Sequence, residues 1–203
     1  MPGRALIVVF VTATLVAGCG GDDDKSGSSA TTSTQPPASR SSSDLAPRAL
    51  KAGELKGFEP AGPGATANSP EDWLTLTSDT TIEQAEYAKS GFVRGYKLDL
   101  QTSDGTAGQS LVIQFKTPAQ AQAEVTRYSK PTPGTDTTPF RLSGIPTAKG
   151  FTAEGQTVGD NVGFTKGAYF YGVGRVREPA SAKQSRDSVI AAAEREYARV
   201  PAG

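Results

Sequence analysis

The chain has 203 residues, with 21 basic and 21 acidic residues, no histidine and one cysteine. A net charge of zero argues against nucleic-acid binding, which needs a basic surface to neutralise phosphates. The absence of histidine excludes histidine-based catalysis and histidine zinc sites, and a lone cysteine excludes an intrachain disulfide. We therefore expect no catalytic residues of these kinds, no metal and no cofactor.

Residues 1–18 have the pattern of a secretory signal. Arg4 supplies a basic start, and residues 5–17 (ALIVVFVTATLVA) are apolar at 11 of 13 positions. A helix of that length spans about 20 Å, whereas a membrane-spanning helix needs about 20 residues. The run ends at small residues, which predicts signal cleavage between Gly18 and Cys19.

The four residues Val16-Ala17-Gly18-Cys19 resemble the lipobox of bacterial lipoproteins. The resemblance implies that the Cys19 thiol is diacylglycerylated, that the signal is cut before it, and that the new amino terminus can be acylated. Two acyl chains anchor a protein stably. The implied location is the extracytoplasmic face of the cell membrane; in a bacterium with two membranes, Gly20 also permits transport to the outer one. An ordinary signal peptide with an incidental cysteine is the alternative.

Residues 19–44 are predicted to form a lipidated, disordered tether. The 25 positions after Cys19 include 16 Gly, Ser, Thr or Pro residues and only two apolar ones, Ala30 and Ala38. Such a segment buries too little apolar surface to offset the entropy of ordering. The acidic run at 22–24 is interpreted as solvated carboxylates, not a cation site. Its Ser and Thr content also permits O-glycosylation.

Residues 45–203 are predicted to form a single α+β domain. Ser69-Pro70 and Thr117-Pro118 are typical helix starts, Asp104-Gly105 marks a turn, and a Pro-rich linker is expected at 131–139. The expected helices and strands lie, in chain order, at 45–55 (helix), 69–76 (helix), 80–88 (helix), 96–100 (strand), 111–115 (strand), 117–128 (helix), 150–151 (strand), 162–164 (strand), 169–176 (strand) and from about 179 to 200 (helix). We interpret this order as two hairpin-plus-helix units that form one antiparallel sheet, with the helices packed on one face.

The motifs that could carry catalysis or cofactor binding are weak. Gly172-Val173-Gly174 lacks the third glycine of a nucleotide-binding loop and is better explained as a strand under a helix. Residues 99–105 depart from a calcium loop and favour a turn. Glu194 and Glu196 lie on different sides of a helix, so they form no catalytic pair. We expect a protein without enzyme activity, with a hydrolase that uses carboxylates alone as the exception left open.

One pattern in the last predicted strand favours binding. Alternation places Tyr169, Tyr171, Arg175 and Arg177 on the same face. Arginine beside tyrosine can hold an anionic or carbohydrate-like ligand by forked hydrogen bonds and stacking. The alternative is a structural strand face, and helices that covered this face would make the tyrosines part of the core.

Two functions remain open. The first is a membrane-anchored binding or sensing domain for a small molecule or glycan; the second is an accessory or scaffolding lipoprotein that docks another envelope protein. A cleft lined by tyrosine and arginine would favour the first, and a broad apolar patch the second. The hairpin and the strand-rich half that ends in a helix are similar to uncharacterised extracytoplasmic lipoproteins of actinobacteria, a resemblance that supplies no activity.

Overall fold

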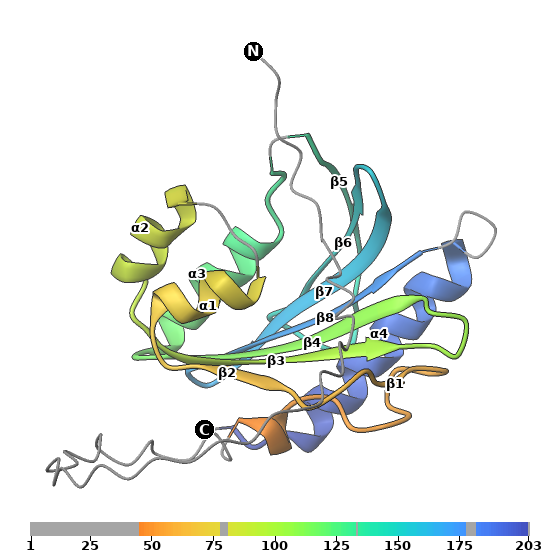
Figure 1. Cartoon of the computed structure of the whole chain (residues 1–203), viewed down its shortest axis with the longest axis horizontal. Coiled ribbons are helices and arrows are strands. Elements are labelled where there is room, and N and C mark those ends of the chain that lie inside the picture. The colour runs from red at the N-terminus through yellow and green to blue at the C-terminus, as the bar shows by residue number, and fades with distance from the viewer. Residues whose placement is uncertain (1–44, 78–80, 133, 178–181, 203) are drawn as a thin grey trace, which may run out of the picture.

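The computed structural model describes residues 45–77, 81–132, 134–177 and 182–202. Within these residues it is an α+β fold, with an antiparallel sheet between helices (Figure 1). The predicted signal and tether, and with them Gly18 and Cys19, lie outside the described residues. The elements are β1 (Glu59–Pro60), β2 (Ala65–Ala67), α1 (Pro70–Thr77), α2 (Thr81–Lys89), β3 (Phe92–Gln101), β4 (Ala107–Phe115), α3 (Pro118–Tyr128), β5 (Asp136–Phe140), β6 (Lys149–Glu154), β7 (Val158–Lys166), β8 (Tyr169–Val176) and α4 (Ala182–Arg199).

The predicted local signals for helices and turns are confirmed. The Ser69 hydroxyl accepts a hydrogen bond from the Asp72 amide at the start of α1. The Thr117 hydroxyl accepts one from the Gln120 amide at the start of α3. Gly105 has a φ of 86°, which suits glycine, and it forms the tight turn between β3 and β4. Each of these signals depends on residues close together in the chain, so the sequence alone could locate them.

The sheet joins eight strands in the order β1-β3-β4-β8-β7-β6-β5, with β2 paired to β3. Every pairing is antiparallel, and β4 and β8 lie at its centre, where Val112 is opposite Tyr171. The two predicted hairpin-plus-helix units are present as β3-β4-α3 and β7-β8-α4. Residues 136–140, predicted as linker, form the edge strand β5 instead, and Pro139 is tolerated there because an edge strand needs fewer backbone donors.

Helices cover both faces of the sheet, so the prediction of helices on one face is wrong. Helices α1, α2 and α3 lie on one face, and α4 lies on the other (Figure 1). The physical reason is visible in β4, where Leu111 and Ile113 point to the first face and Val112 to the second, and all three are buried. A strand that is apolar at consecutive positions needs cover on both sides.

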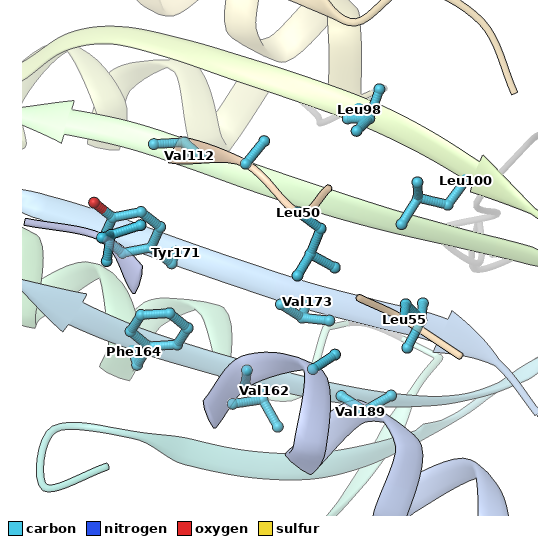
Figure 2. Close-up of a cluster of buried hydrophobic side chains, with 14 of the residues drawn as sticks. Leu50, Leu55, Leu98, Leu100, Val112, Val162, Phe164, Tyr171, Val173 and Val189 are labelled. Atoms are coloured by element: carbon cyan, nitrogen blue, oxygen red, sulfur yellow. The ribbon is translucent and has the colours of Figure 1, made fainter. Parts of the chain in front are cut away.

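The α4 face carries the larger core cluster (Figure 2). Its buried residues come from the strands, from α4, from the segment before β1 and from the loop before β6: Leu45, Ala49, Leu50, Leu55, Phe58, Tyr96, Leu98, Leu100, Val112, Ile145, Val162, Phe164, Tyr171, Val173, Val189, Ala192, Ala193 and Val200. The opposite face holds the cluster Ala67, Trp73, Leu74, Tyr87, Phe92, Leu111, Ile113, Phe115, Ala121, Val125 and Phe170. The sheet therefore separates two cores.

We call residues 45–58 the strap, because they cross the α4 face in an irregular conformation. A helix was predicted at 45–55, but the strap contains only a single 3₁₀ turn, Ala46–Arg48. Gly53 has a φ of 77°, which a helix does not allow. Proline and glycine also have low helix propensity, so both disfavour the predicted helix. The strap's apolar side chains are nonetheless buried, so their spacing reflects contact with the sheet.

Candidate functional site

The four residues of the predicted binding stripe share one face of the β8 region, the face that α4 and the strap cover. Tyr171 is 0% exposed. Tyr169, Arg175 and Arg177 are half-buried. The face is as predicted, but no open row of four side chains exists, because Tyr171 belongs to the core.

The tyrosine half of the stripe is closed by contacts within the chain. The Tyr171 ring stacks on Phe164 with their centroids 4.9 Å apart, and its hydroxyl accepts a 2.9 Å hydrogen bond from Nη1 of Arg48 in the strap. The Arg48 guanidinium also lies 3.9 Å from the centroid of the Tyr169 ring. Burial raises the pKa of the Tyr171 phenol, although the bond from Arg48 acts in the other direction. The aromatic platform is therefore already occupied by Arg48.

The arginine half has a different environment, centred on a buried carboxylate. Asp160 on β7 is 0% exposed and lies opposite Arg175 on β8 and Thr152 on β6. The Thr152 hydroxyl donates a 2.7 Å hydrogen bond to Asp160 Oδ1. Arg186, in the first turns of α4, donates a 3.3 Å bond from Nη2 to the Thr152 hydroxyl. We call Arg175, Arg177 and Arg186, together with Asp160 and Thr152, the arginine cluster.

Charge in the arginine cluster is poorly balanced. Arg177 is 3.8 Å from Asp160 and 4.0 Å from Glu154, whose side chain is 51% exposed. Both distances are longer than a charge-assisted hydrogen bond, which is about 2.7–2.9 Å. Burial lowers the pKa of the Arg175 guanidinium, and the charge of Asp160 acts in the other direction. Arg177 thus lies within ion-pair distance of the buried carboxylate, Arg175 is its cross-strand neighbour, and Arg186 is linked to it through Thr152.

Several buried polar atoms of this cluster lack a hydrogen-bond partner among the described residues. They are Oδ2 of Asp160 and Nε of Arg177 and Arg186, and the hydroxyl of the adjacent Ser185 is in the same condition. Buried polar groups are nearly always paired in folded proteins, and each unpaired one costs about 1–3 kcal/mol. A cluster with this many unpaired atoms is a candidate binding site, because a ligand or water can complete it.

Three side chains of this cluster, Asp160, Thr152 and Arg186, were not predicted as site residues. Asp160 has the same alternation as Val162 and Phe164, so the pattern alone places its carboxylate on an apolar face. An inward-facing carboxylate near the predicted Arg175 is a signal that sequence reasoning could have used. Arg186 had no such signal, because only the packing of α4 brings it to Thr152.

A second buried polar group lies beneath the strap. Glu196 of α4 is 0% exposed, and its Oε1 accepts a long, 3.5 Å hydrogen bond from the Ser110 hydroxyl. That hydroxyl in turn accepts a 3.1 Å bond from the Leu50 amide of the strap. Burial raises the pKa of the Glu196 carboxyl well above its ordinary value, and the nearby charge of Arg199 only partly opposes this. This carboxyl is enclosed in the core and does not face a surface.

The weak motifs behave as structural features. The space beside Gly172 is filled by Leu111 and Phe170, so this glycine relieves crowding on the α3 face. Asp104 accepts hydrogen bonds from Thr102 and from the Thr106 amide within the β3-β4 turn. Among the described residues, no group of three or more metal-ligating side chains comes together.

No helix in the described part of the chain is both long and apolar enough to cross a membrane. Neither a family model nor a curated protein matches the sequence. Among solved structures, the crystal structure of the extracellular domain of PknH from Mycobacterium tuberculosis is similar, with 16% sequence identity and a TM-score of 0.45. The likeness covers 71% of this chain and 92% of that chain. It is too distant to transfer a function.

Proposed function

We propose that the chain is a lipid-anchored, extracytoplasmic binding domain that takes an anionic ligand at the arginine cluster and performs no chemistry on it. The location rests on the lipobox resemblance at Cys19. The binding site rests on one observation: Arg175, Arg177 and Arg186 gather near one buried carboxylate, and the Nε atoms of Arg177 and Arg186 lack partners among the described residues.

Guanidinium groups are suited to this role because they are always charged and present several donors in a planar fork that matches carboxylate, sulfate and phosphate oxygens. Three guanidinium groups near the single buried carboxylate of Asp160 leave an excess of positive charge. Its unpaired Oδ2 can also accept a hydrogen bond, so an anion that carries a hydroxyl group, such as an acidic sugar, would satisfy more of the cluster than phosphate alone.

The alternative, an accessory protein that docks an envelope partner through an apolar surface, has less support. Among the described residues, Val93 is the single large hydrophobic side chain that is exposed, at 39%. Apolar docking surfaces generally need a contiguous patch of several hundred Å². A single exposed valine does not form such a patch.

The experiment is a titration of the purified full chain with inorganic phosphate, glucuronate and, as a neutral comparison, glucose. A ligand that binds only the folded state raises the melting temperature, so phosphate and glucuronate should raise it and glucose should not.

Arg177→Ala should weaken binding by about 10-fold or more, which corresponds to the loss of a hydrogen bond to a charged group. Arg141→Ala, at an exposed position outside the cluster, is the matched control and should bind as the wild type does. Equal responses of the two variants, or no anion effect, would contradict the proposal.

A further inference from the structure

Basic side chains gather where the strap meets the last turns of α4. The strap, the end of β7 and the last turns of α4 carry six basic side chains: Arg48, Lys51, Lys56, Lys166, Arg195 and Arg199. We call these six residues the basic end. On the opposite face, α1 and α2 carry the exposed residues Glu71, Asp72, Glu86 and Lys89, and the exposed Lys116 and Lys130 lie on the α3 side.

The basic end is one continuous surface because α4 holds the strap. Arg199 donates hydrogen bonds of 2.7 Å to the carbonyls of Pro47 and Ala49, and it forms a 2.9 Å ion pair with Glu54. Arg195 donates a bond to the Glu54 carbonyl. At the end of β7, Lys166 donates a 2.8 Å bond to the carbonyl of Tyr197.

Little negative charge offsets these cations. Glu54 is paired with Arg199, and Glu196 is buried where its charged form is disfavoured. Glu194 is the remaining acidic residue in the last turns of α4. The side chains of Lys51, Lys56 and Arg195 are exposed, so three cations of the basic end reach solvent.

The same end receives the chain from its amino-terminal side. The described residues begin at Leu45, the first residue of the strap, and 25 residues separate it from Cys19. A segment of that length, if flexible, has a root-mean-square span of about 25–30 Å. Because this segment joins the chain at the strap, an anchor at Cys19 keeps the basic end within that distance of the lipid headgroups.

From this arrangement we propose that the basic end docks on an anionic membrane surface and orients the domain with α1 and α2 away from the lipid. Clustered lysine and arginine side chains are attracted to anionic headgroups within about a Debye length of the surface. The flexible anchor supplies proximity, and the charged face supplies orientation. Arg186 and Arg199 occupy opposite ends of α4, about 20 Å apart along its axis, so the α4 part of the basic end lies far from Arg186.

The test compares the full chain, isolated from membranes, in two kinds of vesicle: phosphatidylcholine alone, and phosphatidylcholine with phosphatidylglycerol. Lysine acetylation is read by mass spectrometry. We expect several-fold slower acetylation of Lys51 and Lys56 on the anionic vesicles, reversed by added salt. Lys130 and Lys183, both exposed and outside the basic end, should react equally on both vesicles. Equal rates at Lys51 and Lys56 on the two vesicles, or slowing at all four lysines, would overturn the proposal.

Charge reversal separates orientation from anchoring. Hydrogen exchange of the strap amides should be slower on anionic than on neutral vesicles, and the double variant Lys51→Glu with Lys56→Glu should lose that difference. The control, Lys116→Glu with Lys130→Glu, makes the same change of charge at exposed positions on the α3 side and should keep it. A control variant that loses the difference as well would overturn the proposal. Flotation with neutral vesicles reports the lipid anchor by itself, so a failure of the anchor is distinguished from a failure of docking.

Discussion

At one end of β8, Tyr169 and Tyr171 are enclosed by Arg48 of the strap and by Phe164, and the Tyr171 hydroxyl accepts a hydrogen bond from Arg48. At the other end, Arg177 lies 3.8 Å from Asp160 and its Nε has no partner among the described residues, while Arg175 is the cross-strand neighbour of Asp160. The two ends have the same strand, the same face and the same alternation. The difference teaches that a strand pattern assigns a side chain to a face, while the rest of the fold decides whether that side chain is core or site.

The strongest way to sharpen this comparison is to truncate the closed end. Tyr171→Ala removes a fully buried ring from the core between Phe164 and the strap, and buried aromatic truncations cost about 3–5 kcal/mol. Since small domains have about 5–15 kcal/mol of stability in total, denaturant unfolding should show a large loss.

Tyr171→Phe is the matched control, because it keeps the ring and removes only the acceptor for Arg48. We expect a loss of about 1 kcal/mol, typical of one hydrogen bond. If the unfolding free energy of Tyr171→Ala were within about 1 kcal/mol of the wild-type value, the tyrosine half would not belong to the core. The two ends of β8 would then not differ in the way described.

The second prediction concerns Glu196, whose carboxyl lies beneath the strap beside Ser110 and within reach of the charges of Arg199 and Glu54. Burial raises the folded-state pKa above the ordinary value, so the folded chain keeps a proton that the unfolded chain has already released. Stability is therefore highest below the ordinary pKa and falls as the pH rises toward the raised value. The slope from this one group is about 1.4 kcal/mol per pH unit over that interval.

Glu196→Gln should remove this slope and make the protein more stable than the wild type at neutral pH, because an amide needs no proton to stay neutral. Urea unfolding between pH 5 and pH 8 measures both effects. Glu194→Gln, two residues earlier on the same helix and half-buried, is the control and should leave the slope in place. A wild-type curve that is flat across this range would show that Glu196 ionises normally.

Local features of the fold could be predicted from the sequence, and long-range ones could not. Ser69 and Thr117 were identified as helix caps because a cap involves residues three positions apart. The helix expected in the strap and the linker expected at 136–140 were wrong because their conformations depend on pairing with distant parts of the sheet.

The candidate site divides in the same way. Arg175 and Arg177 were named from the alternation of β8 alone. The enclosure of Tyr171 depends on Arg48, which is 123 residues away in the sequence. Arg186 joins Thr152 across 34 residues. Strand alternation therefore gave the correct face, and contacts between distant elements decided which half of the stripe remained available to a ligand.

The smallest expected effect on stability comes from the arginine end. Arg175 lies over the Phe58 ring at 4.8 Å, a contact that contributes about 0.5–1 kcal/mol where it is partly exposed. Its guanidinium is also destabilised by burial, so removal relieves part of that cost. Arg175→Ala should therefore lower the unfolding free energy by no more than about 1 kcal/mol, well below the loss from Tyr171→Ala.

The same variant should have a larger effect on binding than on folding, because its lost hydrogen bonds are made to a ligand and not to the core. We expect phosphate affinity to fall about 10-fold or more. Arg175→Lys keeps the charge and loses the planar fork, so its affinity should lie between those of the wild type and the alanine variant. Unfolding and phosphate titration on one preparation give both numbers. If Arg175→Ala lost as much stability as Tyr171→Ala and kept its affinity for phosphate, both ends of β8 would be structural. The two ends would then differ only in how deeply they are buried.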